Sequence, residues 1–284
     1  MGPDRPLTAA AAGSALDQPR AQAVDRWLNT LASLVQLAWL PLAVVAVIII
    51  LLEVAGAAGW LPITVPSPSQ IANAFALRTG DLLFHATPTV INALAGYGLA
   101  LTLALVLAAI ATTLKVMEKP IFNLGVMVDS IPIIALAPIL IIWLKNGQEA
   151  KIVVAMLAAQ FPLLVGAIQG FKAVDRTMAE LFHVLSASPT QRLVKLALPT
   201  ALPYLFAACK VAAPLAVLGA LFGDWAGGDQ GIGMMMVYAM FSFDTPVVWM
   251  TILFVCGMAL AGYALVAVLE TIIIRWDTGG KVGG

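Results

Sequence analysis

Six stretches with almost no charged residues most constrain what this chain can fold into. A helix of about 20 apolar residues crosses the hydrocarbon core of a bilayer and satisfies its own backbone hydrogen bonds there. With 61% hydrophobic and 11% charged residues among 284, the composition excludes an ordinary soluble domain. We therefore predict an all-α membrane protein with six transmembrane helices, which lie within residues 35–52, 86–113, 121–144, 152–171, 203–222 and 247–269.

The distribution of lysine and arginine predicts which loops face the cytoplasm, where such residues accumulate. The loops after the first, third and fifth spans hold only Arg78, Lys145 and Lys151. The two termini and the loops after the second and fourth spans hold eleven, namely Arg5, Arg20, Arg26, Lys115, Lys119, Lys172, Arg176, Arg192, Lys195, Arg275 and Lys281. We therefore expect both termini in the cytoplasm. The expected divisions are a partly disordered cytoplasmic tail at 1–34, a first transmembrane helix with an outer loop at 35–80, and a second cytoplasmic tail at 276–284.

A mixed polar and apolar segment, residues 177–203, interrupts the apolar pattern between the fourth and fifth spans. Thr177 is followed three residues later by Glu180, and Ser188 is followed three residues later by Gln191. Each pair has the spacing of a capping box, in which two side chains satisfy backbone N–H groups at the start of a helix. The segment therefore predicts two short helices in series.

Prolines bound the second of these helices. Pro189 is at its expected first position, where the missing N–H costs nothing. Pro199 and Pro203 are expected to end it before the fifth span. A helix pair of this size between two spans is a candidate docking surface, and the alternative is an interfacial amphipathic segment without a partner.

This segment resembles the EAA loop of binding-protein-dependent ABC importer permeases, in which Glu-x-x-x-x-x-Gly-Ala-Ser precedes a Leu-Pro. The matching residues are Glu180, Ala187, Ser188, Leu198 and Pro199. Leu181 and Phe182 replace two small residues of the family, and Ser186 replaces its glycine. If that position requires a positive φ, Ser186 is strained there. The resemblance implies coupling helices that sit in an ATPase cleft and include Glu180, Leu181, Leu185, Ser186, Ala187, Ser188 and Gln191.

The third span combines Asp129 with Pro132 and Pro138, and we expect each proline to break the ladder of backbone hydrogen bonds. A carboxylate at the centre of a bilayer costs about 2.5–3.5 kcal/mol, so Asp129 is a candidate functional residue. The alternative is a structural hydrogen bond to a neighbouring helix. The string IPIIALAPILIIW resembles the third span of the same family, most of all its thiamine-pyrimidine-precursor and riboflavin-type members, although the family more often has a neutral amide at Asp129.

A glycine-rich segment, residues 219–236, contains Asp224 and Trp225 and predicts a re-entrant or outer gate segment. The family usually has Glu-Trp here, so Asp224 is one methylene shorter. Trp225 is either a stacking platform for a flat ligand or an anchor at the membrane interface. The residues that we assign to the translocation path or gate are Asp129, Pro132, Pro138, Asp224 and Trp225.

The resemblance implies a type I ABC importer permease fold, with its transmembrane domain at 81–275 and a coupling loop at 177–203. It also implies a homodimer in a bacterial inner membrane, with two copies of a cytoplasmic ABC ATPase and an external substrate-binding protein. The chain has no phosphate-binding loop and no metal-ligand motif. We therefore expect no enzymatic activity and no cofactor on this chain, with ATP and Mg on the partner ATPase.

The same resemblance makes a heteroaromatic related to thiamine-pyrimidine precursors the expected substrate. Taurine, an alkanesulfonate or nitrate is the alternative. A different class, a stand-alone secondary transporter or channel, would use Asp129 as an ion site. Such a protein would work without a partner and usually contains inverted repeats, which the sequence does not display.

Overall fold

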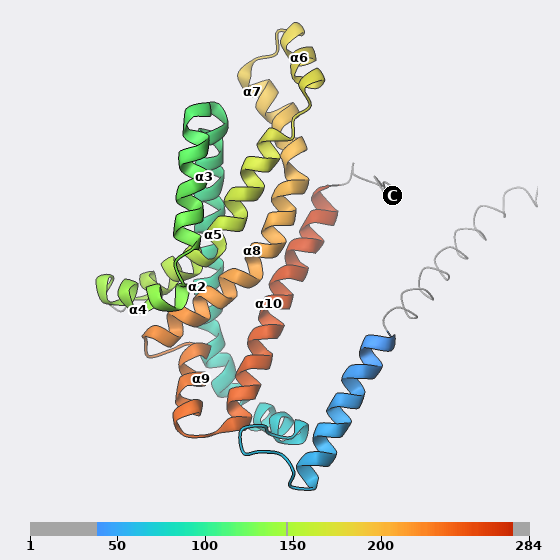
Figure 1. Cartoon of the computed structure of the whole chain (residues 1–284), viewed down its shortest axis with the longest axis vertical. Helices are drawn as coiled ribbons and strands as arrows, with labels where there is room; N and C mark the ends of the chain where they lie inside the picture. The colour runs from blue at the N-terminus through green and yellow to red at the C-terminus, as the bar shows by residue number, and fades with distance from the viewer. Residues whose placement is uncertain (1–38, 146, 275–284) are drawn as a thin grey trace, which may run out of the picture. The chain divides into compact units, whose positions relative to one another are not determined.

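The computed structural model describes residues 39–145 and 147–274, and within these ranges it contains helices and no strand (Figure 1). The predicted tails at 1–34 and 276–284 lie outside the described residues. The helices are Trp39–Ala57, α2 (Pro68–Thr113), α3 (Lys115–Asp129), α4 (Ile133–Trp143), α5 (Gln148–Lys172), α6 (Arg176–Val184), α7 (Pro189–Arg192), the π-helix η1 (Leu193–Ala197), α8 (Leu198–Ala226), α9 (Ile232–Phe241) and α10 (Thr245–Ile273).

The lengths of these helices agree with the predicted spans. Five of the described helices are long and apolar enough to cross a bilayer, and the bent pair α3 and α4 makes a sixth if it counts as one span. The first span ends later than predicted, because its helix continues past Glu53 to Ala57. Glu53 is tolerated near the end of this helix, where its carboxylate accepts a hydrogen bond from the Ser69 backbone N–H at 3.0 Å. A kink at Arg78 separates the first part of α2 from the predicted second span.

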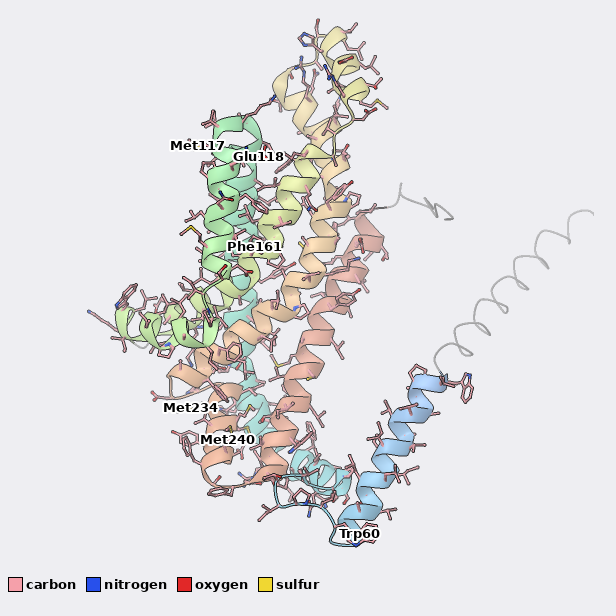
Figure 2. All side chains as sticks on the ribbon, in the orientation of Figure 1. Trp60, Met117, Glu118, Phe161, Met234 and Met240 are labelled. Atoms are coloured by element: carbon pink, nitrogen blue, oxygen red, sulfur yellow. The ribbon has the colours of Figure 1, made fainter. Side chains whose placement is uncertain are left out.

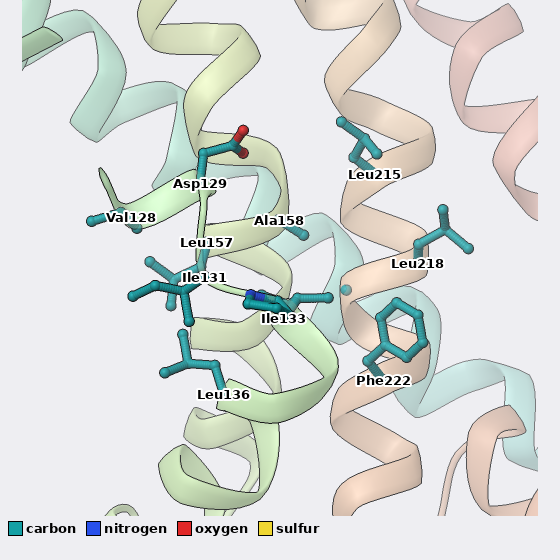
Figure 3. Close-up of a pocket in the computed structure, with 12 residues that line it drawn as sticks. Val128, Asp129, Ile131, Ile133, Leu136, Leu157, Ala158, Leu215, Leu218 and Phe222 are labelled. Atoms are coloured by element: carbon teal, nitrogen blue, oxygen red, sulfur yellow. The ribbon is translucent and has the colours of Figure 1, made fainter. Parts of the chain in front are cut away.

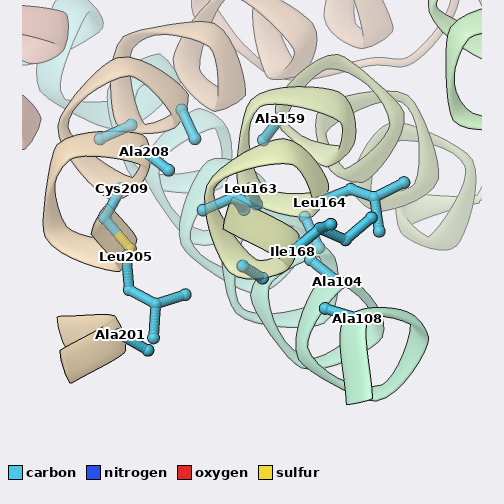
Figure 4. Packing of buried hydrophobic residues seen from close by; sticks show 14 of the residues in the cluster. Ala104, Ala108, Ala159, Leu163, Leu164, Ile168, Ala201, Leu205, Ala208 and Cys209 are labelled. Atoms are coloured by element: carbon cyan, nitrogen blue, oxygen red, sulfur yellow. The ribbon is translucent and has the colours of Figure 1, made fainter. Parts of the chain in front are cut away.

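The chain divides into two compact units, Met1–Ser69 and Gln70–Gly284. The second unit is built around α5 and α8, which pack closely because small residues face each other (Figure 4). A Cβ added at Gly166 of α5 would lie 2.3 Å from the Cβ of Ala208 on α8. Within this unit, α6 and α7 lie at one end and α9 at the other (Figure 1). Near the α6 end, Glu118 of α3 forms an ion pair with Lys172 at the end of α5 (Figure 2).

The third predicted span is broken, and α3 and α4 meet at an angle of 93°. α3 ends at Asp129, and Pro132 is the N-cap residue of α4. The Ser130 hydroxyl donates to the Val126 carbonyl at 2.7 Å, which satisfies one acceptor at the end of α3. The expected break at Pro132 is therefore confirmed. Pro138 lies inside α4 and does not end it, although it has no N–H to donate to the helical hydrogen bonds.

Candidate functional site

The first helix of the predicted coupling loop begins earlier than its sequence suggests. Asp175 is the N-cap of α6, and its carboxylate accepts a hydrogen bond from the Thr177 backbone N–H at 3.3 Å. The predicted capping box of Thr177 and Glu180 is therefore wrong, because the N-cap is Asp175, two residues before Thr177. Glu180 instead pairs with Arg176, one turn before it, at 3.1 Å. Both side chains are exposed, so this ion pair contributes little to stability.

The second predicted capping box is confirmed. The Ser188 backbone N–H donates to Gln191 Oε1 at 2.9 Å, and the Gln191 backbone N–H donates to Ser188 Oγ at 3.3 Å. Between the two helices, Ser186 has φ 55°. The condition stated for strain at Ser186 is therefore met, and a serine with this φ bears a strain of about 1–2 kcal/mol.

Arg192 holds this strained turn, and the sequence analysis missed that role. Its Nε donates to the Ala187 carbonyl at 3.1 Å, and its Nη2 lies 3.0 Å from His183 Nδ1. One guanidinium thus joins α6, the turn and α7. Its position immediately after the second capping box was the available signal, since a basic residue at the end of a short helix can reach free carbonyl groups.

The second helix of the loop is continuous with the fifth span. α7 passes through the π-helix η1 into α8, so Pro199 and Pro203 do not end the pattern as expected. Pro199 lies in the first turn of α8 and Pro203 lies inside it. A displacement of α7 therefore reaches α8 directly.

An exposed apolar surface covers the outside of α6. Leu181 is 49%, Val184 80% and Leu185 67% exposed. Neighbouring side chains on the same short helix include charged Arg176 and Glu180. An apolar patch with a polar rim on a solvated loop is typical of an interaction site.

A cavity of about 230 Å³ lies at the break between α3 and α4 (Figure 3). Its walls come from α3, α4, α5 and α8, and its lining residues are Val128, Asp129, Ile131, Pro132, Ile133, Leu136, Leu157, Ala158, Leu215, Leu218, Gly219 and Phe222. The Asp129 carboxylate makes no hydrogen bond or ion pair with any described residue. Within 39–145 and 147–274 there is thus no helix-to-helix hydrogen bond of the kind considered for Asp129. Pro132 lines the same cavity and Pro138 does not.

Asp224 has a different environment, fully buried near the end of α8. Lys151 Nζ of α5 lies 3.1 Å from its Oδ1, and the Thr89 hydroxyl of α2 donates to its Oδ2 at 2.6 Å. The Ile232 backbone N–H donates in turn to Thr89 Oγ1 at 2.9 Å, and Lys151 Nζ donates to the Gln230 carbonyl at 2.7 Å. We call Asp224, Lys151 and Thr89 the buried polar cluster. It joins three long helices to the segment that leads into α9.

Two glycines let the backbone pass close to this cluster. Gly231 has φ 128°, and a Cβ there would lie 2.2 Å from the Asp224 carboxyl carbon. Gly228 has φ 131°, and a Cβ there would lie 2.4 Å from Lys151 Nζ. The glycine-rich segment is therefore held in place, and the Gly231 N–H also donates to His85 Nδ1 at 3.2 Å. The gate role of Asp224 stays a prediction, while its structural role is visible.

Trp225 lies next to Asp224 and is partly buried. Its ring makes an edge contact with Phe222, a lining residue of the cavity, at 6.4 Å between centroids. Its indole N–H is buried and has no hydrogen-bond partner among the described residues. Within the same residues, no group of three or more His, Cys, Asp and Glu side chains could hold a metal ion.

Comparisons with known proteins agree with this arrangement. Residues 100–275 match the family model described as binding-protein-dependent transport system inner membrane component. The chain is 33% identical over 220 residues to the formylaminopyrimidine transport permease protein ThiX of Halalkalibacterium halodurans, which covers 76% of this chain and 86% of the relative. It is 30% identical over 221 residues to the riboflavin transport system permease protein RibX of Chloroflexus aurantiacus, which covers 77% of this chain and 82% of the relative.

A solved structure has a similar fold. A chain of the MetNI methionine ABC transporter in an inward-facing conformation superposes with a TM-score of 0.52 and 18% sequence identity. The likeness covers 69% of this chain and 98% of that one. At this identity the comparison concerns the fold alone, and it confirms the predicted fold class.

Proposed function

We propose that this chain forms the translocation path of an ATP-driven importer as a homodimer. The chain belongs to the family of binding-protein-dependent transport system inner membrane components. Two cytoplasmic ABC ATPases and one external substrate-binding protein complete the assembly. The observation that carries the proposal is that the family match spans residues 100–275, which include the α6–α7 loop, Asp129 and Asp224. Both termini and this loop then face the cytoplasm, as the excess of lysine and arginine favours.

The α6–α7 loop is the contact with the ATPase in this proposal. Support comes from the exposed Leu181, Val184 and Leu185 and from the stiffening of the turn by Arg192. Closure of the ATPases on ATP displaces α7, and η1 carries the displacement into α8. α8 lines the cavity at the α3–α4 break and holds Asp224 near its far end. One continuous helical segment thus links ATP binding to the path, as a two-state transport cycle requires.

The proposed substrate is a small nitrogen heteroaromatic related to formylaminopyrimidine. The name of the relative ThiX supports this class, and riboflavin, in the name of RibX, is also a nitrogen heteroaromatic. The residues that line the α3–α4 cavity include no lysine, arginine or histidine among those described. A sulfonate, taurine or nitrate importer would need a counter-charge for its anion, and this cavity offers none.

Reconstitution tests the proposal against a stand-alone secondary transporter. The chain is placed in vesicles with the ATPase and binding protein that co-purify with it from its native membrane, and uptake of the ligand extracted from that binding protein is measured. We expect uptake only with both partners and ATP. Uptake driven by an ion gradient without the ATPase would replace the importer with a secondary transporter.

A further inference from the structure

His85 joins α2 to the start of α9, at the end of the second unit opposite α6 (Figure 1). Its Nδ1 accepts a hydrogen bond from the Gly231 backbone N–H at 3.2 Å. Gly231 is the N-cap residue of α9, and the next backbone N–H, that of Ile232, donates to Thr89 Oγ1 at 2.9 Å. His85 and Thr89 are four residues apart and therefore lie on one face of α2. Two side chains of α2 thus hold successive N–H groups at the start of α9, where a helix supplies no acceptor of its own.

The hydrogen bond from Gly231 requires a neutral imidazole. A backbone N–H only donates, so the Nδ1 of His85 offers a lone pair and the ring proton is on Nε2. A protonated imidazole has an N–H at both nitrogens and accepts no hydrogen bond. Histidine is the side chain that ordinarily gains this proton between about pH 8 and pH 5. The hydroxyl of Thr89 does not titrate in that range, so only one of the two links depends on pH.

A cavity of about 230 Å³ gives protons a route to His85. It is lined by Arg78, Asp81, His85, Met235, Tyr238, Ala239, Ser242, Asp244 and Val247. The side chains of Arg78 and Asp81 are 51% and 65% exposed, so the cavity is open to water. Arg78 pairs with Asp81 at 3.8 Å and with Asp244 at 3.7 Å, which leaves two carboxylates to one guanidinium. A cationic His85 therefore finds an excess of opposite charge in the cavity that it already lines.

The charged groups on the other side of the Gly231 link are already paired. Asp224 lies against Gly231, and its counter-charge is Lys151 at 3.1 Å. This carboxylate is fully buried and is held by its own partners, so it attracts a cationic His85 less than the cavity carboxylates do. The remaining titratable side chain of the cavity among the described residues is Tyr238 of α9, and a phenol carries no charge between about pH 5 and 8.

We propose that His85 is a positioning residue of the glycine-rich segment and that its protonation releases this segment. Neutral His85 holds Gly231, and with it the start of α9, against Asp224. Cationic His85 turns its ring to the carboxylates of Asp81 and Asp244, and the Gly231 N–H loses its acceptor. This inference rests on the proposed function, which places this end of the protein outside the cytoplasm, where the pH follows the medium. An acidic medium then loosens the segment in which we predict the outer gate.

Hydrogen–deuterium exchange of residues 227–233 in the permease–ATPase complex in lipid nanodiscs tests the proposal. His85→Asn keeps an acceptor near the position of Nδ1 and does not titrate, whereas His85→Phe keeps a ring and has no acceptor. At pH 7.5 we expect wild type and His85→Asn to exchange equally and His85→Phe to exchange about fivefold faster, the effect of one hydrogen bond. At pH 5.5 the wild type should exchange as fast as His85→Phe, and His85→Asn should stay slow. Variants are compared at one pH at a time, so the intrinsic exchange rate cancels.

The matched control is His183→Asn, because the chain has two histidines and this is the other one. It should keep the wild-type response of residues 227–233 to pH. Equal exchange in wild type and His85→Asn at pH 5.5 would overturn the inference, and so would a His183→Asn variant that abolishes the response. If His85→Phe fails to assemble, the comparison of wild type with His85→Asn at the two pH values decides alone. ATP-driven uptake is measured separately in vesicles, so that its absence contradicts the proposed function and not the role of His85.

Discussion

Asp224 and Asp129 are two carboxylates of predominantly apolar helices, and their surroundings are opposite. Asp224 is fully buried and has Lys151 and Thr89 within hydrogen-bonding distance. Asp129 is exposed, lines the cavity at the α3–α4 break and contacts no partner within the described ranges. A charge removed from water needs partners, so the first arrangement is that of a structural element. A charge that keeps an open cavity before it remains available to a ligand. From the sequence, both residues are assigned to the translocation path or gate, and their surroundings in the structure distinguish them.

The largest effect is expected when the buried polar cluster loses its cation. Lys151→Met keeps the length of the side chain and leaves Asp224 buried without its counter-charge. We expect a loss of about 3–5 kcal/mol in the free energy of unfolding, measured by SDS titration of the purified protein. Adding Asp224→Leu to Lys151→Met should recover most of that loss, because no uncompensated charge remains. A double variant as unstable as the single one would contradict the assigned role of the ion pair.

A smaller loss is expected from the backbone that passes the same cluster. Gly231→Ala forces a methyl group into the Asp224 carboxylate at a residue with φ 128°. Such a backbone strain costs about 1–3 kcal/mol. The matched control is Gly257→Ala in α10, where an added Cβ meets nothing within 4 Å. Equal unfolding free energies for the two variants would show that the glycine segment is not held against Asp224.

The exposed ion pair of α6 extends the comparison to a charge in water. Glu180→Lys places a second cation four residues from Arg176 and should change the free energy of unfolding by no more than about 0.5 kcal/mol. Its effect should appear in function, as reduced retention of the ATPase on the purified permease and less uptake per ATP. Asp175→Ala, which removes the helix cap and leaves Glu180 in place, is the control for a loop that is merely unfolded. Normal retention and uptake in Glu180→Lys would remove this residue from the ATPase contact.

The smallest effect on stability is expected for Asp129. Asp129→Asn breaks no interaction with any described residue, so the unfolding free energy should stay within about 0.5 kcal/mol of the wild type. Uptake by the reconstituted importer should nevertheless change. A large loss of stability with unchanged uptake would make Asp129 a structural residue and remove the contrast with Asp224.

The sequence allows the spans and part of the coupling loop to be predicted. The spans follow from the length of the charge-free stretches, which the bilayer thickness dictates. The capping box of Ser188 and Gln191 is local and was therefore recognisable. The start of α6 was predicted wrongly because Asp175 and Thr177 are both good caps, and the spacing to Glu180 favoured the wrong one.

Pairing between distant residues is what the sequence could not supply. Asp224 and Lys151 lie in different helices, and Lys151 was counted with the loop charges. Thr89 has no local feature that distinguishes it from the other threonines of α2. Pro132 marked the position of the break between α3 and α4, but the bend of 93° depends on packing against α5 and α8.

That bend has a consequence for how the protein enters the membrane. α3 has 15 residues and α4 has 11, so neither arm alone reaches the about 20 residues that a crossing helix needs. The helix ends that meet at the corner leave backbone groups without helical partners, and these are tolerated only where other protein segments or water surround them. Those segments, α5 and α8, are synthesised later. We therefore expect the nascent α3–α4 pair to wait at the translocon, shielded by it or by a chaperone, until the following helices arrive to enclose it.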